Sequence, residues 1–445
     1  MKRPLKILAC MFQGGGNISL ISPILAELIE RRHTVRAIVG PGVRPSRLKV
    51  SPSLLRCIDE IGAELIPLRE VDVHPFDDAT SIDRGLIGSW TPRSFRHVQR
   101  AALTSVWAPT WARNVSSELR REPADIVVAD FVLLGALLAA EAARIPHVAL
   151  MHTVYPWPAA GVPPFGPGYL PKAGPLGFWR DVIGRAVVRR LWVRNGLPSL
   201  NEARSMVGLS ALHSPIQQYE AATRVLVLAS AAFDWVSPHL PANVRHVGTP
   251  EDNANPTQPG CGGLTDGGRP LVVVALSTLD QGQAATLKNI LVALSDLPVR
   301  ALVTLGPALE LEQFKASANV RIERFVPHDM VLPHAAALVT QCGIGTLTKA
   351  LRHGVPMVCL PLVGDQYDNA ARVAARKAGV RLRADAGSDC IRTAIMRVIK
   401  DTHFKQGALM LRAAISLDSN PAQMAADEIE QAVRTVADDD KHASF

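Results

Sequence analysis

Cysteine is scarce in this sequence. The chain has 445 residues and only six cysteines, none of them in a Cys-x-x-Cys pair. Disulfide-stapled secreted domains are dense in cysteine, and zinc sites need closely spaced ligands, so the sequence indicates neither class. We expect buried thiols in a reducing compartment, which predicts a cytoplasmic protein.

Long apolar runs are missing as well. The longest, such as "PLVVVAL" and "ADIVVADFVLLGALLAA", do not reach the roughly 18 to 20 uninterrupted apolar residues of a membrane-spanning helix. Lys2 and Arg3 lead into the short strand "LKILACM" with no small-residue cleavage site behind it. We therefore expect a soluble chain without a secretory signal peptide.

Acidic residues are outnumbered, with 40 Asp and Glu against 48 Lys and Arg and a formal net charge of +8. A positive field attracts anionic ligands, membrane surfaces or nucleic acid. Nucleic acid is not expected, because the sequence has no zinc finger, no RNP-like strand and no lysine-rich tail. Residues 172–196 are locally basic, with Trp179 and Trp192 interleaved. This composition is typical of an interfacial amphipathic helix and also of a domain helix with a solvated arginine face, so peripheral membrane contact stays open.

Alternating strand and helix patterns fill most of the chain. A buried strand at 5–11 is followed by the turn "QGGGN", a helix from about Ser22 to Arg31 and the strand "HTVRAIVG". This alternation predicts an α/β fold with two Rossmann-like, doubly wound domains that face each other across a cleft. The predicted parts are an acceptor-binding domain at 1–248, a Gly/Pro-rich linker at 249–270, a nucleotide-sugar-binding domain at 271–415, and a C-terminal helix and tail at 416–445, with packing of that helix on the first domain as one option.

The stretch "TQCGIGTLTKALRHGVPMVCLPLVGDQYDN", residues 340–369, carries the clearest chemistry. Gly343 and Gly345 let the backbone approach a ligand closely, and the helix that follows offers free N–H groups and its positive dipole end. A structural turn would explain the glycines alone. Asp365 and Gln366 follow the next strand on the same rim of the sheet, where an acid and an amide suit sugar hydroxyls. The combination predicts a seat for a sugar diphosphate.

These residues resemble the nucleotide-sugar-dependent glycosyltransferases of the GT-B fold. The group is UDP-glucuronosyl/glucosyltransferase-like and includes plant secondary-metabolite and bacterial macrolide transferases. The motif residues that carry the resemblance are Phe325, Pro327, His328, Pro333, His334, Gln341 to Thr346, Gly354 to Met357, Pro361, Asp365, Gln366 and Asn369. The resemblance implies that Phe325 and His328 flank the base, that Cys342, Gly343, Gly345 and Thr346 cradle the diphosphate together with Ser277 and Thr278, and that Asp365 and Gln366 hold the donor sugar.

Two departures from the family pattern concern the donor. Gln341 stands where the family usually has a phosphate-binding His, and an amide donates a hydrogen bond without carrying charge. Lys349 stands where plant members have a Glu that bonds the ribose hydroxyls. A site without that acceptor has less reason to demand a 2′-hydroxyl. A dTDP-sugar is therefore as plausible as a UDP-sugar.

A third departure concerns the catalytic base. The family's base, a His after the first strand, falls on Asn17, and an amide cannot accept a proton at neutral pH. The family's orienting Asp matches Asp130, at the end of the strand "ADIVVAD". We expect either that Asp130 acts directly as the base or that His152, at the end of the next strand, takes the role. A helix cap at Asp130 and a structural histidine at His152 are the plain alternatives.

The resemblance implies a hexosyltransferase of natural-product biosynthesis that inverts the anomeric carbon. We expect no metal, because no Asp-x-Asp motif is placed to hold one, and no cofactor besides the nucleotide sugar. The segment 153–200 is Pro-, Gly- and aromatic-rich, and such a loop suggests a pocket for an apolar small-molecule or lipid acceptor. The alternative is an inactive nucleotide-sugar-binding auxiliary protein, which Asn17 and Gln341 would suit. A dinucleotide oxidoreductase is disfavoured, because "HTVRAIVGPG" lacks the acid that would hold a ribose.

Overall fold

The computed structural model describes residues 3–13, 16–40, 52–69, 104–251, 268–278, 281–418 and 420–442. Gly14 and Gly15 of the predicted first turn and most of the predicted linker lie outside these residues.

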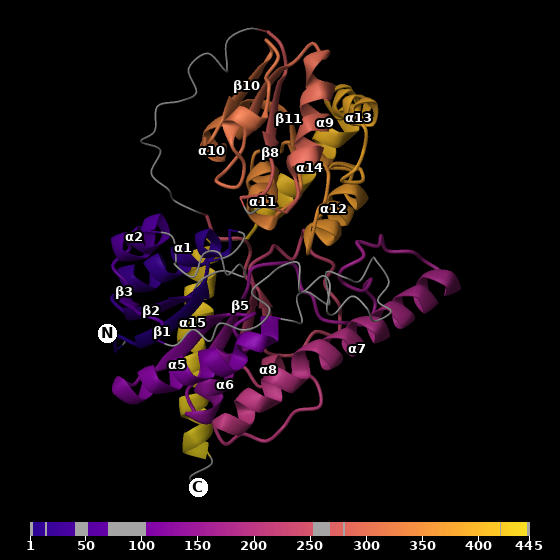
Figure 1. Cartoon of the computed structure of the whole chain (residues 1–445). Coiled ribbons are helices and arrows are strands. Elements are labelled where there is room, and N and C mark those ends of the chain that lie inside the picture. The colour runs from indigo at the N-terminus through magenta and orange to yellow at the C-terminus, as the bar shows by residue number, and fades with distance from the viewer. Residues whose placement is uncertain are drawn as a thin grey trace.

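The first half is built on a seven-stranded parallel sheet with the strand order β3-β2-β1-β4-β5-β6-β7 (Figure 1). Strands β4 and β5 are buried along their whole length, and apolar runs such as "IVVAD" suit strands that are covered on both faces. The order reverses between β1 and β4, which is where ligands bind in open α/β sheets. The strands are β1 (Lys6–Phe12), β2 (Thr34–Gly40), β3 (Glu64–Ile66), β4 (Ile126–Asp130), β5 (His147–Met151), β6 (Arg224–Val227) and β7 (Val244–His246).

Helices connect these strands in the alternation that the sequence predicts. The described helices of this half are α1 (Asn17–Glu30), α2 (Pro52–Glu60), the 3-10 turn η3 (Thr104–Trp107), α5 (Ala108–Arg121), α6 (Leu134–Ala142), α7 (Pro175–Met206) and α8 (Ile216–Glu220).

The second half repeats the plan with a six-stranded parallel sheet in the order β10-β9-β8-β11-β12-β13. Its helices α11 and α12 lie at the edge that faces the first half (Figure 1). The strands are β8 (Leu271–Ala275), β9 (Arg300–Thr304), β10 (Val320–Glu323), β11 (Ala335–Thr340), β12 (Met357–Cys359) and β13 (Gly379–Arg381). The helical elements are α9 (Ala284–Ser295), η4 (Leu311–Gln313), α10 (His328–Val331), η5 (Leu332–His334), α11 (Ile344–Arg352), α12 (Gln366–Ala375), α13 (Ser388–Lys400) and α14 (Thr402–Ile415).

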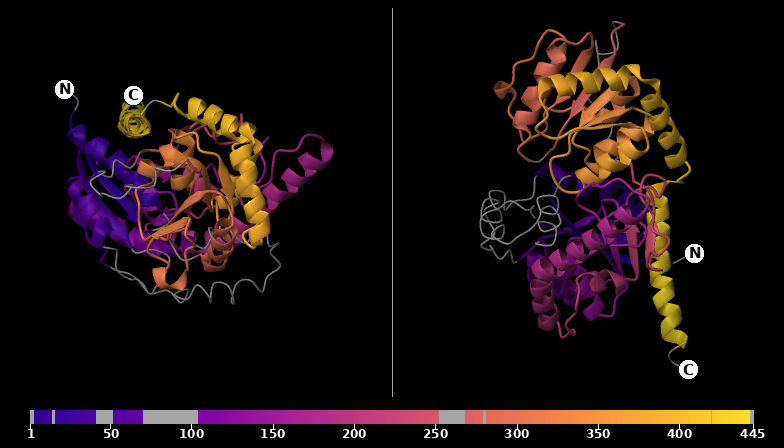
Figure 2. Two further views of the ribbon diagram at one scale, coloured as in Figure 1. Left: turned by 90° about the horizontal axis from the view of Figure 1, so that it is seen from above. Right: turned by 90° about the vertical axis from the view of Figure 1, so that its right-hand side faces the viewer.

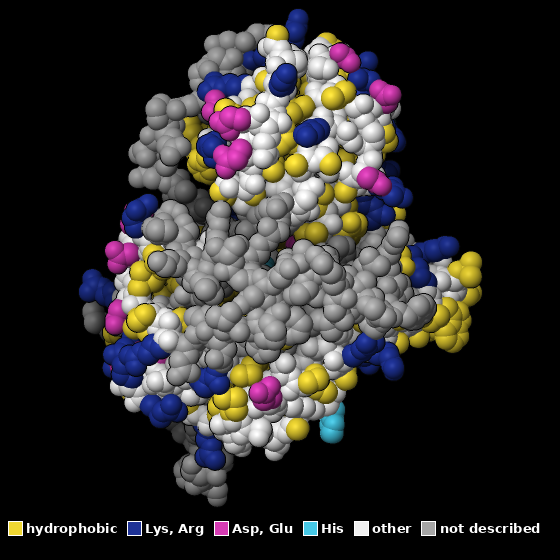
Figure 3. Space-filling model, in the orientation of Figure 1, with side chains coloured by type: hydrophobic (Ala, Val, Ile, Leu, Met, Phe, Trp, Pro, Cys, Tyr) yellow, Lys and Arg dark blue, Asp and Glu magenta, His cyan; other side chains and the backbone are white. Residues whose placement is uncertain are grey.

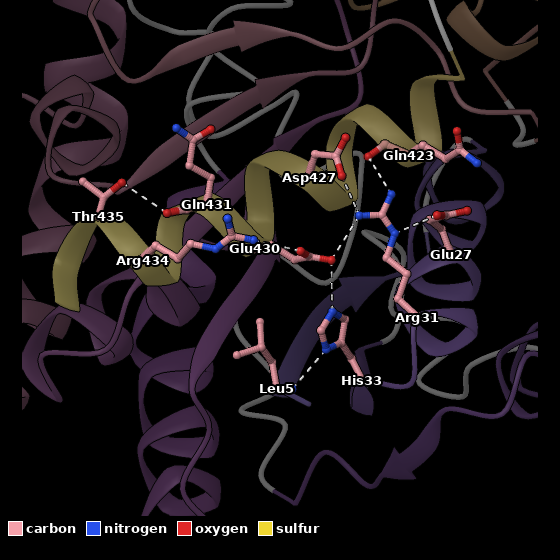
Figure 4. Close-up of polar contacts among 10 residues, drawn as sticks. All are labelled: Leu5, Glu27, Arg31, His33, Gln423, Asp427, Glu430, Gln431, Arg434 and Thr435. Carbon is pink, nitrogen blue, oxygen red and sulfur yellow. Dashed lines mark hydrogen bonds and ion pairs between the residues drawn. The ribbon is translucent and has the colours of Figure 1, made fainter. Parts of the chain in front are cut away.

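The last helix, α15 (Pro421–His442), leaves the second half and lies along the first (Figure 2). Arg31 at the end of α1 pairs with Asp427 at 2.6 Å and with Glu430 at 3.0 Å (Figure 4). His33 Nε2 lies 3.3 Å from Glu430, and its Nδ1 accepts a hydrogen bond from the Leu5 N–H at 3.0 Å. The chain therefore ties its C-terminal end to the start of the first sheet.

The predicted α/β class with two doubly wound sheets is confirmed, and two predicted elements are wrong. Helix α1 begins at Asn17 rather than near Ser22, since apolar residues at helical spacing already start at Ile18 and Pro23 is accommodated inside the helix. The segment 153–200 is not one long loop, because α7 is a single helix of 32 residues that includes Pro198. Among the residues that the structure describes, no helix has both the length and the apolar character needed to cross a bilayer.

Candidate active site

Three polar side chains meet at the carboxyl edge of the first sheet. Asn17 opens α1 after β1, Asp130 ends β4, and His152 follows β5. Asp130 has no solvent exposure, and its Oδ2 accepts a hydrogen bond from Asn17 Nδ2 at 2.8 Å and lies 3.0 Å from His152 Nδ1. Its Oδ1 accepts a hydrogen bond from the Val132 N–H at 3.2 Å. Both carboxylate oxygens are engaged by the protein, so Asp130 is placed to orient its neighbours.

His152 is the member of this group that reaches solvent, with 22% of its side chain exposed. Its ring packs edge-on against Phe131, with the ring centroids 5.1 Å apart. His152 Nδ1 forms no well-aligned hydrogen bond with Asp130 despite this short distance, and catalytic contacts often tighten only when substrate binds. Its Nε2 makes no hydrogen bond with any residue that the structure describes.

The charges around His152 favour its protonated form. Burial is the largest effect and lowers the pKa of His152, but the Asp130 carboxylate, helped by Asp365, outweighs it, so that the net pKa is raised. A carboxylate at Nδ1 also fixes the tautomer in which Nε2 can accept a proton. The pair therefore has the arrangement of a general base and its orienting acid.

A hydrogen bond joins the two halves beside His152. Thr153 Oγ1 donates to Asp365 Oδ2 at 3.2 Å, and Asp365 directly precedes α12. The same oxygen accepts a hydrogen bond from Asn369 Nδ2 at 2.9 Å, and that amide also donates to the Cys342 carbonyl at 2.9 Å. Burial raises the pKa of Asp365. The structure thus brings the acid expected at the donor sugar next to the His152–Asp130 pair.

Gln366, the predicted partner of Asp365, is buried and engaged by the protein. Its Oε1 accepts hydrogen bonds from the N–H groups of Leu362 at 2.8 Å and Val363 at 3.0 Å. Its Nε2 donates to Gln281 Oε1 at 2.9 Å. In this structure Gln366 shapes the loop before α12 and links it to the segment after β8.

The glycine-rich start of α11 is open on its outer side. Cys342 is buried in the left-handed conformation (φ 68°), and Gly343 precedes the helix without supplying a side-chain cap. The N–H groups of residues 344–346 have no hydrogen-bond partner among the described residues, and a Cβ atom on Gly345 would meet nothing within 4 Å. Uncapped N–H groups beside open space can bind an anion. Thr346 lies in this first turn.

Gln341 occupies a structural position instead of reaching outward. In the amide orientation that satisfies both groups, its Nε2 donates to the Ala275 carbonyl at 3.0 Å and its Oε1 accepts from the Ser277 N–H at 3.2 Å. The side chain therefore ties the end of β11 to the end of β8. Ser277 is buried, whereas Thr278 is exposed at the same edge.

The predicted residues of the base site lie near one another after β10. The ring of Phe325 is largely exposed, so a flat ligand can stack on it. His328 Nε2 lies 3.0 Å from Thr304 Oγ1, and burial, reinforced by the Lys349 cation, lowers the pKa of His328 to about 4. His328 is therefore neutral at ordinary pH. Lys349 Nζ donates to Asp329 Oδ2 at 2.6 Å.

Two buried contacts between α12 and the first half were missed from the sequence. Asp368 Oδ2 accepts a hydrogen bond from the Gly166 N–H at 2.8 Å, and burial raises the pKa of Asp368 to about 7. Arg372 Nη2 donates to Asp234 Oδ1 at 2.7 Å, with its guanidinium over the Trp235 ring. The spacing of Asp365, Asp368 and Arg372, at i, i+3 and i+7, was the available signal, because it places three charged residues on one helix face.

The aromatic residues predicted for the acceptor pocket belong in part to the core. Trp157 packs against Trp192 and Tyr219, with ring centroids 4.4 and 4.8 Å apart, and all three side chains are buried. Trp157 and Trp192, which the segment 153–200 contributes, are therefore core residues. Trp192 is also excluded from the exposed face that the basic segment 172–196 was expected to present.

A family model described as UDP-glucoronosyl and UDP-glucosyl transferase matches residues 97–425. The chain belongs to this family. It is a glycosyltransferase, which confirms the resemblance drawn from residues 325–369.

One curated relative and two solved structures that are similar to this chain illustrate the sequence and fold comparisons. The 4'-demethylrebeccamycin synthase of Lentzea aerocolonigenes is 29% identical over 425 residues, which cover 92% of this chain and 94% of that protein. The calicheamicin glycosyltransferase CalG4 has the same fold, with a TM-score of 0.69 at 19% identity over 98% of this chain and 100% of CalG4. The glycosyltransferase VinC, solved in complex with dTDP, gives 0.68 at 19% identity over 96% of this chain and 99% of VinC. The predicted GT-B fold is confirmed.

Proposed function

We propose that this glycosyltransferase moves a hexose from a UDP- or dTDP-sugar to a hydroxyl group of an apolar natural product or lipid, with His152 as the general base. One observation carries the proposal. The His152–Asp130 pair lies beside the Thr153–Asp365 hydrogen bond that joins the two halves. The base and the residue expected at the donor sugar therefore come from opposite halves and meet at one place.

The geometry supports His152 over Asp130 as the base. Asp130 is fully buried with both oxygens engaged, whereas His152 has an exposed edge and a free ring nitrogen in the described structure. Asn17 cannot take a proton, but its amide holds the Asp130 oxygen that faces His152. In the family the base lies on α1, so the proposal is that its role has moved to the residue directly after β5.

The reaction then uses groups of both halves. His152 Nε2 takes the proton of the acceptor hydroxyl as the oxygen attacks the anomeric carbon. The bond between that carbon and the diphosphate oxygen breaks, and its electron pair leaves with the nucleoside diphosphate. The N–H groups of residues 344–346 stabilise the charge that develops there, and Asp130 stabilises the imidazolium. A single displacement of this kind inverts the anomeric carbon, and we propose that it needs neither a metal nor a further cofactor.

The surroundings of Lys349 bear on the choice between UDP- and dTDP-sugars. Its ammonium pairs with Asp329, so position 349 offers no acceptor to a ribose 2′-hydroxyl. This supports acceptance of a dTDP-sugar, in keeping with the fold neighbour VinC, which was solved with dTDP. The acceptor is expected to be apolar, as for a secondary-metabolite aglycone. A cytoplasmic location and a membrane contact of residues 172–196 stay separate predictions.

The inactive alternative loses its main support in this geometry. It rested on Asn17 at the family's base position and on Gln341 at the phosphate position. His152 supplies the missing base, and Gln341 holds two strand ends together rather than replacing a ligand contact.

A ligand panel followed by a turnover assay tests the proposal. Thermal unfolding is measured with UDP, dTDP and GDP and with their common sugars, since a ligand that binds the folded state raises the unfolding midpoint. Transfer of the stabilising donor's sugar is then measured with a panel of phenolic and polyketide acceptors and with water. We expect a midpoint shift with dTDP or UDP, and sugar transfer that His152→Ala lowers by about two to four orders of magnitude. A shift without turnover on any acceptor would contradict the enzymatic role.

A further inference from the structure

The N-terminal end of α7 carries an exposed apolar patch, which we call the α7 tip. It consists of Leu176, Phe178, Trp179 and Ile183, whose side chains are between 59% and 76% exposed, together with the partly exposed Leu170. Figure 1 shows this end of α7 projecting away from the body of the protein. Figure 3 shows apolar side chains gathered at its end, with Lys and Arg side chains beside them. Single exposed apolar residues are ordinary, but a contiguous cluster marks a contact site.

The tip is held in place by packing on its inner side. A Cβ atom on Gly184 would come within 2.5 Å of Pro164, so the helix lies directly on the loop that follows β5. Further along α7, Trp192 is only 3% exposed and packs against Trp157. The Phe178 and Trp179 rings pack edge to face with centroids 5.5 Å apart. The tip is therefore a fixed projection anchored in the core.

Apolar and then basic residues follow one another along one exposed face of α7. Leu176, Trp179 and Ile183 follow the spacing i, i+3 and i+7, which places them on one face. Arg190 and Arg194 continue the same face, since positions seven and eleven residues further on return to it. The helix end is therefore apolar and the turns behind it are cationic, two features that each favour binding to an anionic membrane surface.

The positive charge of this region is not balanced by neighbouring acids. Residues 170–196 contain six basic residues, Lys172, Arg180, Arg185, Arg189, Arg190 and Arg194, and one acid, Asp181. Asp181 pairs with Arg180 at 2.7 Å. Arg189, Arg190 and Arg194 are exposed and form no ion pair with any residue that the structure describes. A partner of this surface must therefore bring both negative charge and an apolar layer.

We propose that the α7 tip docks on a membrane surface that contains anionic phospholipids. Leu176, Trp179 and Ile183 enter the head-group region, and Arg190 and Arg194 contact lipid phosphates. Four or five side chains offer a few hundred Å², less than the roughly 800 Å² per partner of a standard protein interface. A lipid surface has no such minimum, because apolar insertion and electrostatic attraction add. The contact is independent of the proposed transfer chemistry and would bring an apolar acceptor dissolved in the bilayer close to the enzyme.

Vesicle binding of the full chain tests this proposal. The probes are vesicles of phosphatidylcholine alone and of phosphatidylcholine with phosphatidylglycerol, each at low and moderate salt. We expect sedimentation with the anionic vesicles only, weakened by salt. The double change Trp179→Ser with Ile183→Ser should reduce binding by roughly tenfold or more, and Arg190→Gln with Arg194→Gln should reduce it by a similar factor. Brominated lipid should quench the tryptophan fluorescence of the vesicle-bound wild type, and this quenching should be lost in Trp179→Phe.

Met410→Ser is the matched control, because Met410 is an exposed apolar residue on α14 in the second half. Nucleotide binding and the unfolding midpoint should be the same in all variants. Failure of the wild type to bind anionic vesicles would overturn the proposal, as would equal binding by the tip variants. Light scattering tests self-association. If the wild type is a dimer and the tip substitutions dissociate it, the surface binds a second copy of the chain and the membrane assignment is overturned.

Discussion

The carboxyl edges of the two sheets use different kinds of group. In the first half the edge depends on side chains, with Asn17, Asp130 and His152 in one cluster of which only His152 reaches solvent. In the second half the open groups are main-chain N–H groups at the start of α11, while Gln341 and Gln366 are engaged by the protein. A main-chain site tolerates replacement of a side chain, as at position 341. A site that depends on side chains keeps its activity after loss of the base only if another residue can accept the proton.

The largest expected effect therefore concerns His152. His152→Ala should lower kcat by two to four orders of magnitude, because it removes the proton acceptor while leaving the second half intact. Steady-state kinetics measure the loss, and a thermal shift with the nucleotide should show unchanged donor affinity. His239→Ala is the matched control, since it removes an exposed imidazole from the same half. Near-normal turnover in His152→Ala would contradict the claim that the edge of the first sheet acts through the side chain of His152.

The main-chain edge is tested by Gly345→Val. A Cβ atom at this position meets nothing within 4 Å, so the fold should stand, but the branched side chain would fill the space in front of the uncapped N–H groups. We expect donor affinity to fall by about tenfold or more, measured by nucleotide titration. Gly387→Val provides the control, because Gly387 precedes α13 and also has open space around its Cβ position. Equal affinities in the two variants would place the diphosphate elsewhere.

A smaller effect is expected at Asp368, where α12 holds the loop of the first half. The pKa of Asp368 in the folded protein, about 7, lies above the value of about 3.9 in the unfolded chain. Between these two pH values the folded protein therefore binds one more proton than the unfolded chain. The stability that this group contributes is lost as the pH rises through this range. Asp368→Asn cannot titrate and can still accept the Gly166 hydrogen bond. The unfolding midpoint of the variant minus that of the wild type should therefore be larger at pH 8 than at pH 5. Parallel pH profiles of wild type and variant would remove Asp368 from this role.

Much of this arrangement could be predicted from the sequence. Strand-length apolar runs and the glycine turns predict two parallel sheets, and side chains at strand ends must share one edge, so Asn17, Asp130 and His152 could be proposed together. The sequence could not predict which of them is the base and which is the orienting residue, because these roles depend on which side chain is buried. The interpretation of 153–200 failed because Pro and Gly cluster before α7, whereas the residues after Pro175 favour helix. The spacing on α12 marks Arg372 as part of a charged face, but its partner Asp234 lies 138 positions away and no local pattern identifies that partner.

The pH dependence of kcat/KM, compared between the wild type and Asp130→Asn, tests the assignment of the base most directly. His152 must be neutral to accept a proton, so the wild-type rate should fall on the acid side with a midpoint above the ordinary imidazole value of about 6.5, since the net pKa is raised. Asp130→Asn removes the carboxylate and leaves the burial, which lowers the pKa of His152. The account predicts that the acid limb moves to lower pH and that the plateau rate drops. An acid limb that stays in place in Asp130→Asn would contradict it.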